Sequence, residues 1–278
     1  MNFGMVPYDT LTAESLLLPD VQVRGWPVMR EAKIYVGLSK WGEKEWEGTL
    51  FPKGTKDKEK LGWYGKSFNC IELNVTHYKT PAVTDIERWA ASVPQQGFKF
   101  CPKLLQQISH YSGLINAEAS TQTFLDAIRH LGNSLGPVFI QLSENFSPAR
   151  KKALFNYLAS LPKDLSYMLE LRHPDWFTNA EVQQELSEVL ADNQIGWIIT
   201  DTPGIRYATH MQLPVPKTFI RFVCQGDTEL DNLRVADWKK HIDNWITNGL
   251  QELYFIIHAH NEKAAVPFAK LVQTSLVF

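Results

Sequence analysis

Two glutamates and two arginines interrupt or follow apolar runs in this chain and could together perform acid–base chemistry on an anionic substrate. They are Glu72, Glu170, Arg172 and Arg221. Side chains two residues apart on a strand share a face, so Glu72 and Asn74 should point the same way. Two polar groups on one face of a buried strand are costly unless they are paired or functional. This pattern predicts a functional site.

The two glutamates suggest a pair of catalytic carboxylates. Such a pair serves as general acid and base when the environments separate the two pKa values. Glycoside hydrolysis needs a separation of about 5–5.5 Å for retention or about 6.5–9.5 Å for inversion, and a sequence does not give the distance. The structural alternative is that each glutamate pairs with Lys103, Arg172 or Arg221. The two arginines could also clamp a carboxylate or phosphate, because a guanidinium is a planar fork.

We therefore predict four catalytic residues and a larger group that binds substrate. The catalytic candidates carry a titratable group at or just after a predicted strand: Glu72, Glu170, His173 and Asp201. The substrate-binding candidates are polar or aromatic residues in similar positions: Trp41, Asn74, His77, Tyr78, Lys103, Gln141, Arg172, Trp176, Arg221, His258, His260 and Asn261.

A divalent metal is the lesser alternative. His258 and His260 are two residues apart at a predicted strand end, so their imidazoles should share a face. With Glu72, Glu170 or His173 they could supply three ligands, which suits a catalytic zinc with one open position. The H-x-H pair of the barrel metallohydrolases lies on the first strand rather than the last. We therefore assign no metal ligand, and the cofactor remains unassigned.

The composition favours an ordinary globular protein. The chain has 278 residues, 44% hydrophobic and 21% charged, with a formal net charge of −2. That charge provides no global basic surface for nucleic acid, although a local basic groove would leave a nucleic-acid partner open. No apolar run approaches the roughly 20 residues that span a bilayer, and no signal peptide is recognisable. Three widely spaced cysteines suit a reducing compartment, so we expect a cytoplasmic protein without a membrane partner.

Eight strand-like segments alternate with helical patterns along the chain. The segments are short, rich in Ile, Val, Phe and Leu, and suit a parallel sheet covered by helices: 34–38, 69–75, 98–101, 137–142, 166–171, 196–200, 218–223 and 252–258. The charged run at 53–60 is interpreted as a solvated loop. We predict an α/β fold, a TIM-type (β/α)8 barrel of residues 33–278 with an irregular arm over 1–32. A flavodoxin-like doubly wound sheet is the competing fold.

The chain resembles the YecE-like family, also called domain of unknown function seventy-two. The resemblance covers about residues 33–274 and rests on motifs in order: WGEKEWEGTLFP, ELNVTHYKTP, RWAASVP, FKFCPKLLQQISH, LGPVFIQL, ELRHPDW and HNEKAAVPFAKL. It implies a TIM-type barrel and supplies no reaction. The chain departs from the family pattern at His77 and at His258 and His260, which makes a site particular to a subfamily plausible.

Taken together, the residues favour an enzyme that acts by general acid–base chemistry on a small polar, anionic or sugar-like substrate. A hydrolase, lyase or isomerase would fit. One alternative is a nucleic-acid-binding or processing protein that uses aromatic residues at the barrel mouth and local lysines. Another is a ligand-binding barrel without catalysis.

Overall fold

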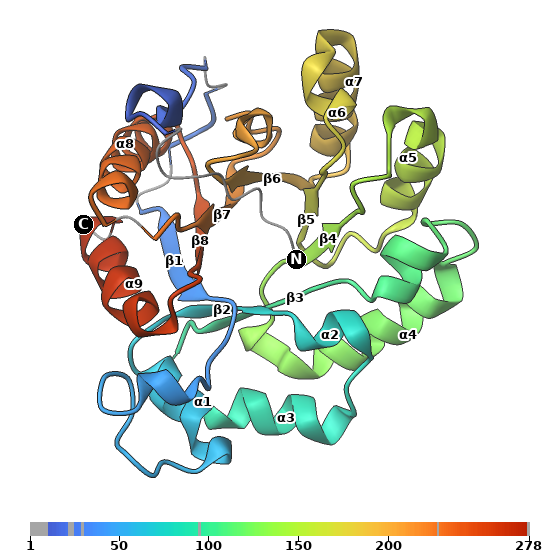
Figure 1. Ribbon diagram of the computed structural model, residues 1–278. Coiled ribbons are helices and arrows are strands. Elements are labelled where there is room, and N and C mark those ends of the chain that lie inside the picture. The colour runs from blue at the N-terminus through green and yellow to red at the C-terminus, as the bar shows by residue number, and fades with distance from the viewer. Residues whose placement is uncertain (1–10, 22–24, 29–30, 94–95, 227, 277–278) are drawn as a thin grey trace.

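The protein folds into a barrel of eight parallel strands surrounded by helices (Figure 1). The computed structural model describes residues 11–21, 25–28, 31–93, 96–226 and 228–276. The strands are β1 (Lys33–Leu38), β2 (Cys70–Leu73), β3 (Lys99–Pro102), β4 (Val138–Gln141), β5 (Tyr167–Glu170), β6 (Gly196–Asp201), β7 (Lys217–Val223) and β8 (Glu252–His258). Their order, β3-β2-β1-β8-β7-β6-β5-β4, runs once around the barrel axis. The predicted TIM-type barrel is confirmed and the doubly wound sheet is excluded, because β1 pairs with both β2 and β8.

The barrel closes least regularly between β3 and β4. In the part of the chain that the structure describes, two isolated bridges join them, Phe100 with Leu135 and Lys103 with Phe139. The amide of Leu104 donates to the carbonyl of Phe139 at 2.9 Å. We call this junction the β3/β4 seam.

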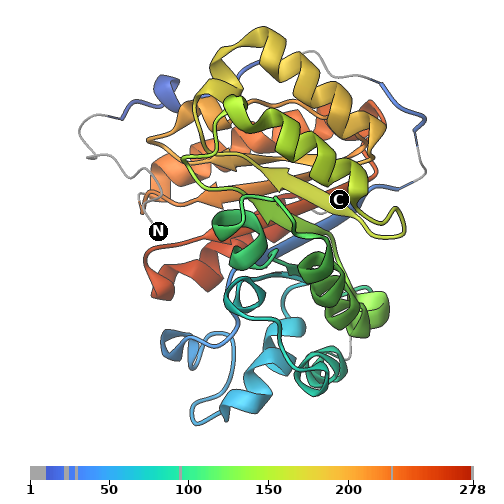
Figure 2. The ribbon, with the colours of Figure 1, turned by 90° about the vertical axis from the view of Figure 1, so that its right-hand side faces the viewer.

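The helices cover the outside of the sheet, as the turned view in Figure 2 shows. They are α1 (Asp57–Gly65), α2 (Val75–Tyr78), α3 (Val83–Ser92), α4 (Glu118–Ile128), α5 (Lys151–Ser160), α6 (Asp175–Thr178), α7 (Ala180–Asp192), α8 (Thr228–Thr247) and α9 (Glu262–Leu276). The interpretation of residues 53–60 as a loop was wrong, because α1 begins inside that run. Lysine and glutamate are good helix formers, and Leu61 and Tyr64 bury the inner face of α1.

The strands are apolar on both faces because one face meets the helices and the other meets the barrel interior. Inside the barrel, Tyr35 of β1 stacks on Tyr254 of β8 with ring centroids 4.6 Å apart. Phe139 and Phe219 pack in the same interior cluster. These apolar side chains fill the barrel interior below the carboxyl ends of the strands, so this part of the barrel is a packed core. At the carboxyl ends of the strands, above this core, the side chains that face the interior are mostly polar or charged.

Segments of the N-terminal arm pack on the outside of the barrel near α8. The amide of Leu18 donates to Oδ2 of Asp237 at 2.9 Å, and the amide of Trp26 donates to the carbonyl of Asn248 at 2.9 Å. Gly249 has a φ of +94°, and a Cβ there would lie 2.4 Å from the carbonyl oxygen of Trp26. Only glycine fits this combination of backbone angle and close approach. Residues 1–10, 22–24 and 29–30 of the predicted arm lie outside the described residues.

None of the helices in the described ranges combines the length and the hydropathy that a bilayer crossing requires.

Candidate active site at the barrel mouth

A layer of polar side chains closes the interior of the barrel at the carboxyl ends of its strands. Inward-facing residues come from each of β2 to β8, at the strand end or directly after it. Asn74 and Arg172 also belong to this layer, two positions after Glu72 and Glu170 in the sequence. We call these residues the inner network: Glu72, Asn74, Lys103, Gln141, Glu170, Arg172, Thr200, Arg221 and His258. The network is buried apart from Asn74 and Arg172, which are half-buried.

Arg221 is the centre of the inner network. Its Nε and Nη2 donate to the two carboxylate oxygens of Glu72 at 2.9 and 3.0 Å. Its Nη1 donates to both oxygens of Glu170 at 2.9 Å. The guanidinium thus bridges two fully buried carboxylates, and charge-assisted hydrogen bonds of this kind are among the strongest in proteins.

The charges in this cluster fix the ionisation of both glutamates. Burial alone would raise the pKa of Glu72, but the charge of Arg221 and the contacts of His258 together outweigh this effect and hold that pKa well below the usual range. Burial likewise opposes the ionisation of Glu170, and Arg221 followed by Arg172 lowers its pKa to about 2. Both carboxyl groups are therefore ionised at neutral pH, as acceptors rather than proton donors.

Further donors complete the shell around Glu72. Nδ2 of Asn74 donates to Oε1 of Glu72 at 2.9 Å, and Nε2 of His258 lies 3.1 Å from Oε2. Burial lowers the pKa of His258, and the charge of Glu72 only partly offsets this effect. The imidazole is therefore neutral at pH 7 and donates to Glu72 from Nε2.

Three donors besides Arg221 saturate Glu170. Nε2 of Gln141 donates to Oε2 of Glu170 at 2.6 Å. Oγ1 of Thr200 and Nε of Arg172 each donate to Oε1 at 3.1 Å. Thr200 was missed by the sequence reasoning, although it precedes a predicted site residue.

Lys103 differs from the other charged residues of the inner network. Its side chain is 1% exposed, and Nζ donates to Oε1 of Gln141 at 2.7 Å. No carboxylate of the described residues lies within ion-pair distance of this ammonium group. Burial, and after it the charge of Arg221, lowers the pKa of Lys103 to about 8. A buried cation without an anionic partner is unusual, because protein interiors pair or neutralise their charges.

Two histidines lie beside Lys103. The rings of His77 and His110 are 5.0 Å apart, and Nδ1 of His77 is 2.8 Å from the carbonyl of Leu104. Burial, and after it the charge of Lys103, lowers the pKa of His77 to about 4 and lowers that of His110. Both imidazoles are neutral at pH 7. His110 was not among the residues predicted for the site, and the structure places it at the mouth beside His77.

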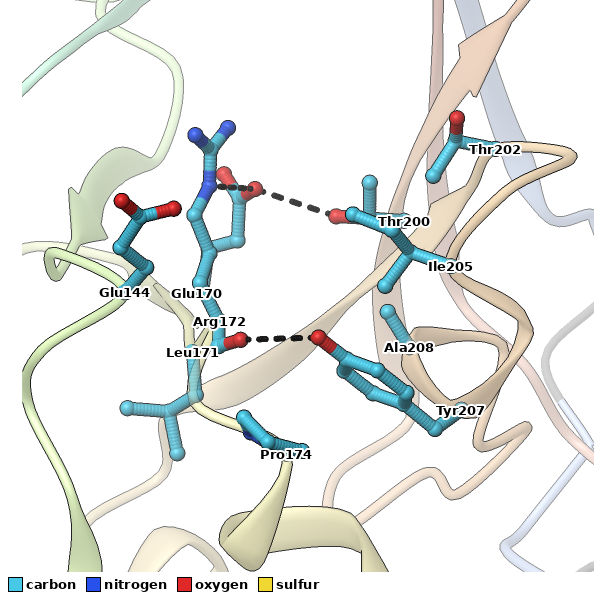
Figure 3. Close-up of a pocket in the computed structure, with 10 residues that line it drawn as sticks. All are labelled: Glu144, Glu170, Leu171, Arg172, Pro174, Thr200, Thr202, Ile205, Tyr207 and Ala208. Atoms are coloured by element: carbon cyan, nitrogen blue, oxygen red, sulfur yellow. Dashed lines mark hydrogen bonds and ion pairs between the residues drawn. The ribbon is translucent and has the colours of Figure 1, made fainter. Parts of the chain in front are cut away.

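A cavity of about 200 Å³ opens beside Glu170 and Arg172 (Figure 3). Figure 3 shows Arg172 and Glu144 on one wall, with Tyr207 on the opposite side. The hydroxyl of Tyr207 donates to the carbonyl of Arg172 at 3.3 Å. The loop after β6 supplies much of the lining, including Ile205, and this loop carries no pattern that the sequence reasoning recognised.

Of the four catalytic candidates, Glu170 lines this cavity, and Asp201 faces away from it. It is the neighbour of Thr200 on β6 and faces outward, where it binds Arg206, Arg234 at 3.0 Å and Nε1 of Trp238 at 2.7 Å. Side chains alternate between faces, so an inward Thr200 requires an outward Asp201. Asp201, predicted from the sequence as a catalytic residue, therefore points away from the barrel interior.

The outward contacts of Asp201 belong to a second buried ion cluster. Arg234 also binds Asp231 at 2.8 Å. We call Asp201, Asp231, Arg206 and Arg234 the outer network. Nη2 of Arg206 donates to the carbonyl of Leu16 at 2.8 Å, so this network ties the N-terminal arm to β6 and α8.

The remaining candidates are dispersed around the mouth. Trp176 is 0% exposed and donates to the carbonyl of Phe146 at 2.7 Å, so it is a core residue rather than a wall of the mouth. His173 accepts from the amide of Asp175 at 3.2 Å. Tyr78 is 63% exposed. Trp41 packs edge-on against Trp89 with centroids 6.1 Å apart.

The two histidines near β8 do not act together. His258 is buried against Glu72, whereas His260 is exposed and lines a separate crevice between the loops that follow β7 and β8. Asn261 accepts from the amide of Lys263 at 3.1 Å at the start of α9. Within the described ranges, no group of three or more His, Cys, Asp or Glu side chains is arranged to hold a metal ion.

Comparisons with known proteins point to one family. A family model described as a protein of unknown function, DUF72, matches residues 35–277. The protein YecE of Escherichia coli is 27% identical over 230 residues, which cover 76% of this chain and 82% of YecE. YunF of Bacillus subtilis is 28% identical over 183 residues, 62% of each chain.

Solved structures of DUF72 proteins share the fold. The protein from Thermotoga maritima superposes with a TM-score of 0.72 at 19% identity, covering 88% of this chain and 99% of that one. The protein from Enterococcus faecalis gives a TM-score of 0.65 at 17% identity, covering 89% and 98%. The names of these proteins state no activity.

Proposed function

The chain belongs to the DUF72 family, and from that premise and the geometry of the mouth we propose that it is an enzyme that acts on a small anionic substrate by general acid–base chemistry. In barrels of this type the working residues sit at the carboxyl ends of the strands. The inner network and the 200 Å³ cavity beside it occupy that end.

The observation that carries the proposal is an excess of positive charge. Among the residues of the inner network, which all lie in the described part of the chain, the three cationic side chains of Lys103, Arg172 and Arg221 accompany the two carboxylates of Glu72 and Glu170. The acidic Glu144 also lines the cavity, but it is exposed at the outer wall. A desolvated cation attracts an anion much more strongly than an exposed one. A carboxylate or phosphate group of a substrate would balance the buried charge.

Lys103 is the group best suited to proton transfer. A general acid or base works best when its pKa lies near the operating pH, and the pKa of Lys103 is about 8. Glu72 and Glu170 remain ionised, which fits a role in orienting Arg221 and the neighbouring donors. Lys103, with the neutral His77 and His110 as its neighbours, is therefore the proposed acid–base group in place of the glutamate pair.

Thermal unfolding in the presence of anions tests this proposal. Phosphate, sulfate and acetate, compared with chloride at constant ionic strength, should raise the melting temperature of the parent protein. Lys103→Met and Arg172→Met should lose most of that increase. Lys99→Met is the matched control, because Lys99 lies at the opposite end of β3 and binds the carbonyl of Asn133 at 2.8 Å. Equal responses in all four proteins would refute the anion site.

A binding barrel without catalysis is the second candidate. The burial of Lys103 favours it, since a group that is 1% exposed reaches a ligand only after its neighbours move. Mass spectrometry that monitors whether a bound anionic compound is converted to product distinguishes an enzyme from a binding barrel.

Nucleic acid binding is the third candidate, and exposed aromatic residues favour it. Tyr78 and Tyr111 are 63% and 70% exposed after β2 and β3, where they could stack on bases. Sub-micromolar binding of a single-stranded oligonucleotide at physiological salt would promote this candidate over the enzyme.

A further inference from the structure

We propose that the amine of Lys103 forms an imine with the carbonyl group of a small aldehyde or ketone that carries a carboxylate or phosphate. This inference rests on the proposed function of the mouth as an anion site. It adds a covalent role and a substrate class to that site.

The position of Lys103 carries the inference. The side chain leaves the end of β3 and enters the inner network, where every other cation contacts a carboxylate. The hydrogen-bond partner of its Nζ is the neutral amide oxygen of Gln141, at 2.7 Å. A neutral partner stabilises an ammonium group less than a carboxylate does, and it can be replaced by the carbonyl oxygen of a substrate.

The surroundings of Lys103 favour the uncharged amine, which is the nucleophile. Burial has the largest effect and lowers the pKa of this amine, and the charge of Arg221 lowers it further, whereas the charges of Glu72 and Glu170 act in the opposite direction. The sum of these effects brings the pKa of the amine to about 8. A desolvated lysine beside another cation is the arrangement that activates lysine for attack on carbonyl groups.

The proposed step balances without any other reactant. The lone pair of Nζ attacks the carbonyl carbon, and the C=O π electrons move to oxygen. A proton passes from nitrogen to that oxygen and gives a carbinolamine. The second proton of the nitrogen passes to the carbinolamine oxygen, which leaves with the C–O bonding electrons as water, and the electron pair left on nitrogen forms the C=N bond. His77 and His110 are neutral and near Lys103, so they can carry these protons.

Borohydride trapping tests the inference. The parent protein is incubated at pH 8 with pyruvate, with dihydroxyacetone phosphate or with uncharged acetaldehyde, and sodium borohydride is added. Reduction of an imine leaves a permanent secondary amine, which peptide mass mapping assigns to one lysine. We expect the two anionic probes to label Lys103 about tenfold more than any other lysine, and acetaldehyde to show no such preference. Lys103→Met should lose this label and Lys99→Met should keep it.

The outcomes separate this inference from the proposed function. If anions stabilise the protein but no anionic probe labels Lys103, the imine is wrong and the anion site stands. If anions neither stabilise the protein nor promote labelling, both fail. Equal labelling of all lysines also overturns the imine. If Lys103→Met does not fold, peptide mapping of the parent protein and of Lys103→Arg gives the same decision.

Discussion

Two buried ion clusters lie back to back at the end of β6, and they differ in their charge balance. Thr200 faces the inner network and its neighbour Asp201 faces the outer network. The outer network matches the carboxylates of Asp201 and Asp231 with the guanidinium groups of Arg206 and Arg234. The inner network sets three cationic side chains against two carboxylates and lies beside a cavity.

This difference shows that burial and ion pairing alone do not identify a functional site. The outer network is balanced, and its guanidinium groups also donate to backbone carbonyls, Arg206 to Leu16 of the arm and Arg234 to Val223 and Asp201. These contacts hold the arm, β6, β7 and α8 together. The inner network retains at Lys103 a buried ammonium group that has no ion pair with a carboxylate of the described residues. Burying such a charge would not stabilise a purely structural cluster.

The largest effect should follow removal of the centre of the inner network. Arg221→Met leaves Glu72 and Glu170 buried without their main cation, and it should cost about 3–5 kcal/mol of the free energy of unfolding. Urea denaturation at pH 7 measures this loss. A loss below about 1 kcal/mol would mean that Lys103 and Arg172 compensate, and the two networks would then be less distinct than their geometry indicates.

The outer network should affect stability without affecting anions. Asp201→Asn removes a charge between Arg206 and Arg234, while an amide oxygen can still accept from Trp238. We expect a loss of about 2–3 kcal/mol in urea denaturation, the size of a hydrogen bond to a charged group. The thermal response to phosphate should equal that of the parent protein. A weaker response would show that the two networks are coupled.

Lys103→Met should change stability in the opposite direction. The unfolded chain holds the lysine proton up to a pKa of 10.5, whereas the folded protein releases it near 8. Stability of the parent protein therefore rises between pH 8 and 10.5, and the cost of the buried charge is fully present below pH 8. After subtraction of the lost Gln141 hydrogen bond, the variant should be about 1–2 kcal/mol more stable at pH 7.

Urea denaturation of both proteins at several pH values tests whether the variant is the more stable of the two. The advantage of the Lys103→Met variant should disappear as the pH rises towards 10.5. A variant that is several kcal/mol less stable at pH 7 would assign Lys103 a structural role like that of Arg221.

The smallest effect is expected at the rim of the cavity. Tyr207→Phe removes a 3.3 Å hydrogen bond to the carbonyl of Arg172 from a partly exposed ring, and it should cost less than about 0.5 kcal/mol. Phosphate titration should show at most about a threefold loss of affinity, because only the orientation of Arg172 changes. A loss of tenfold or more would place the hydroxyl of Tyr207 in direct contact with the anion.

The fold was predictable because its strands are short apolar runs at regular spacing, and such runs differ clearly from the helical segments between them. The glutamates and arginines of the inner network were also recognisable, since Glu72 and Arg221 interrupt otherwise apolar strands. The orientation of Asp201 was not predictable from the sequence. Both faces of β6 are buried, so the pattern does not show which residues face the barrel interior.

The loops limited the rest of the prediction. Tyr207, Ile205 and Glu144 reach the cavity from segments without periodicity, and their positions depend on the packing of the whole barrel. His110 reached the mouth through a π-helical turn, Gln107–Tyr111, whose register differs from that of an α-helix.

The β3/β4 seam gives the barrel a preferred place to open. Within the described chain, two isolated bridges hold this junction, whereas seven paired residues join β7 to β8. Local opening follows the region with the fewest cooperative hydrogen bonds, so amide hydrogens along β3 and β4 should exchange with deuterium earlier than those of β7 and β8. Lys103 is a partner in one of the two bridges. Brief separation of the seam would therefore give small solutes access to the amine of Lys103, which is buried in the closed barrel.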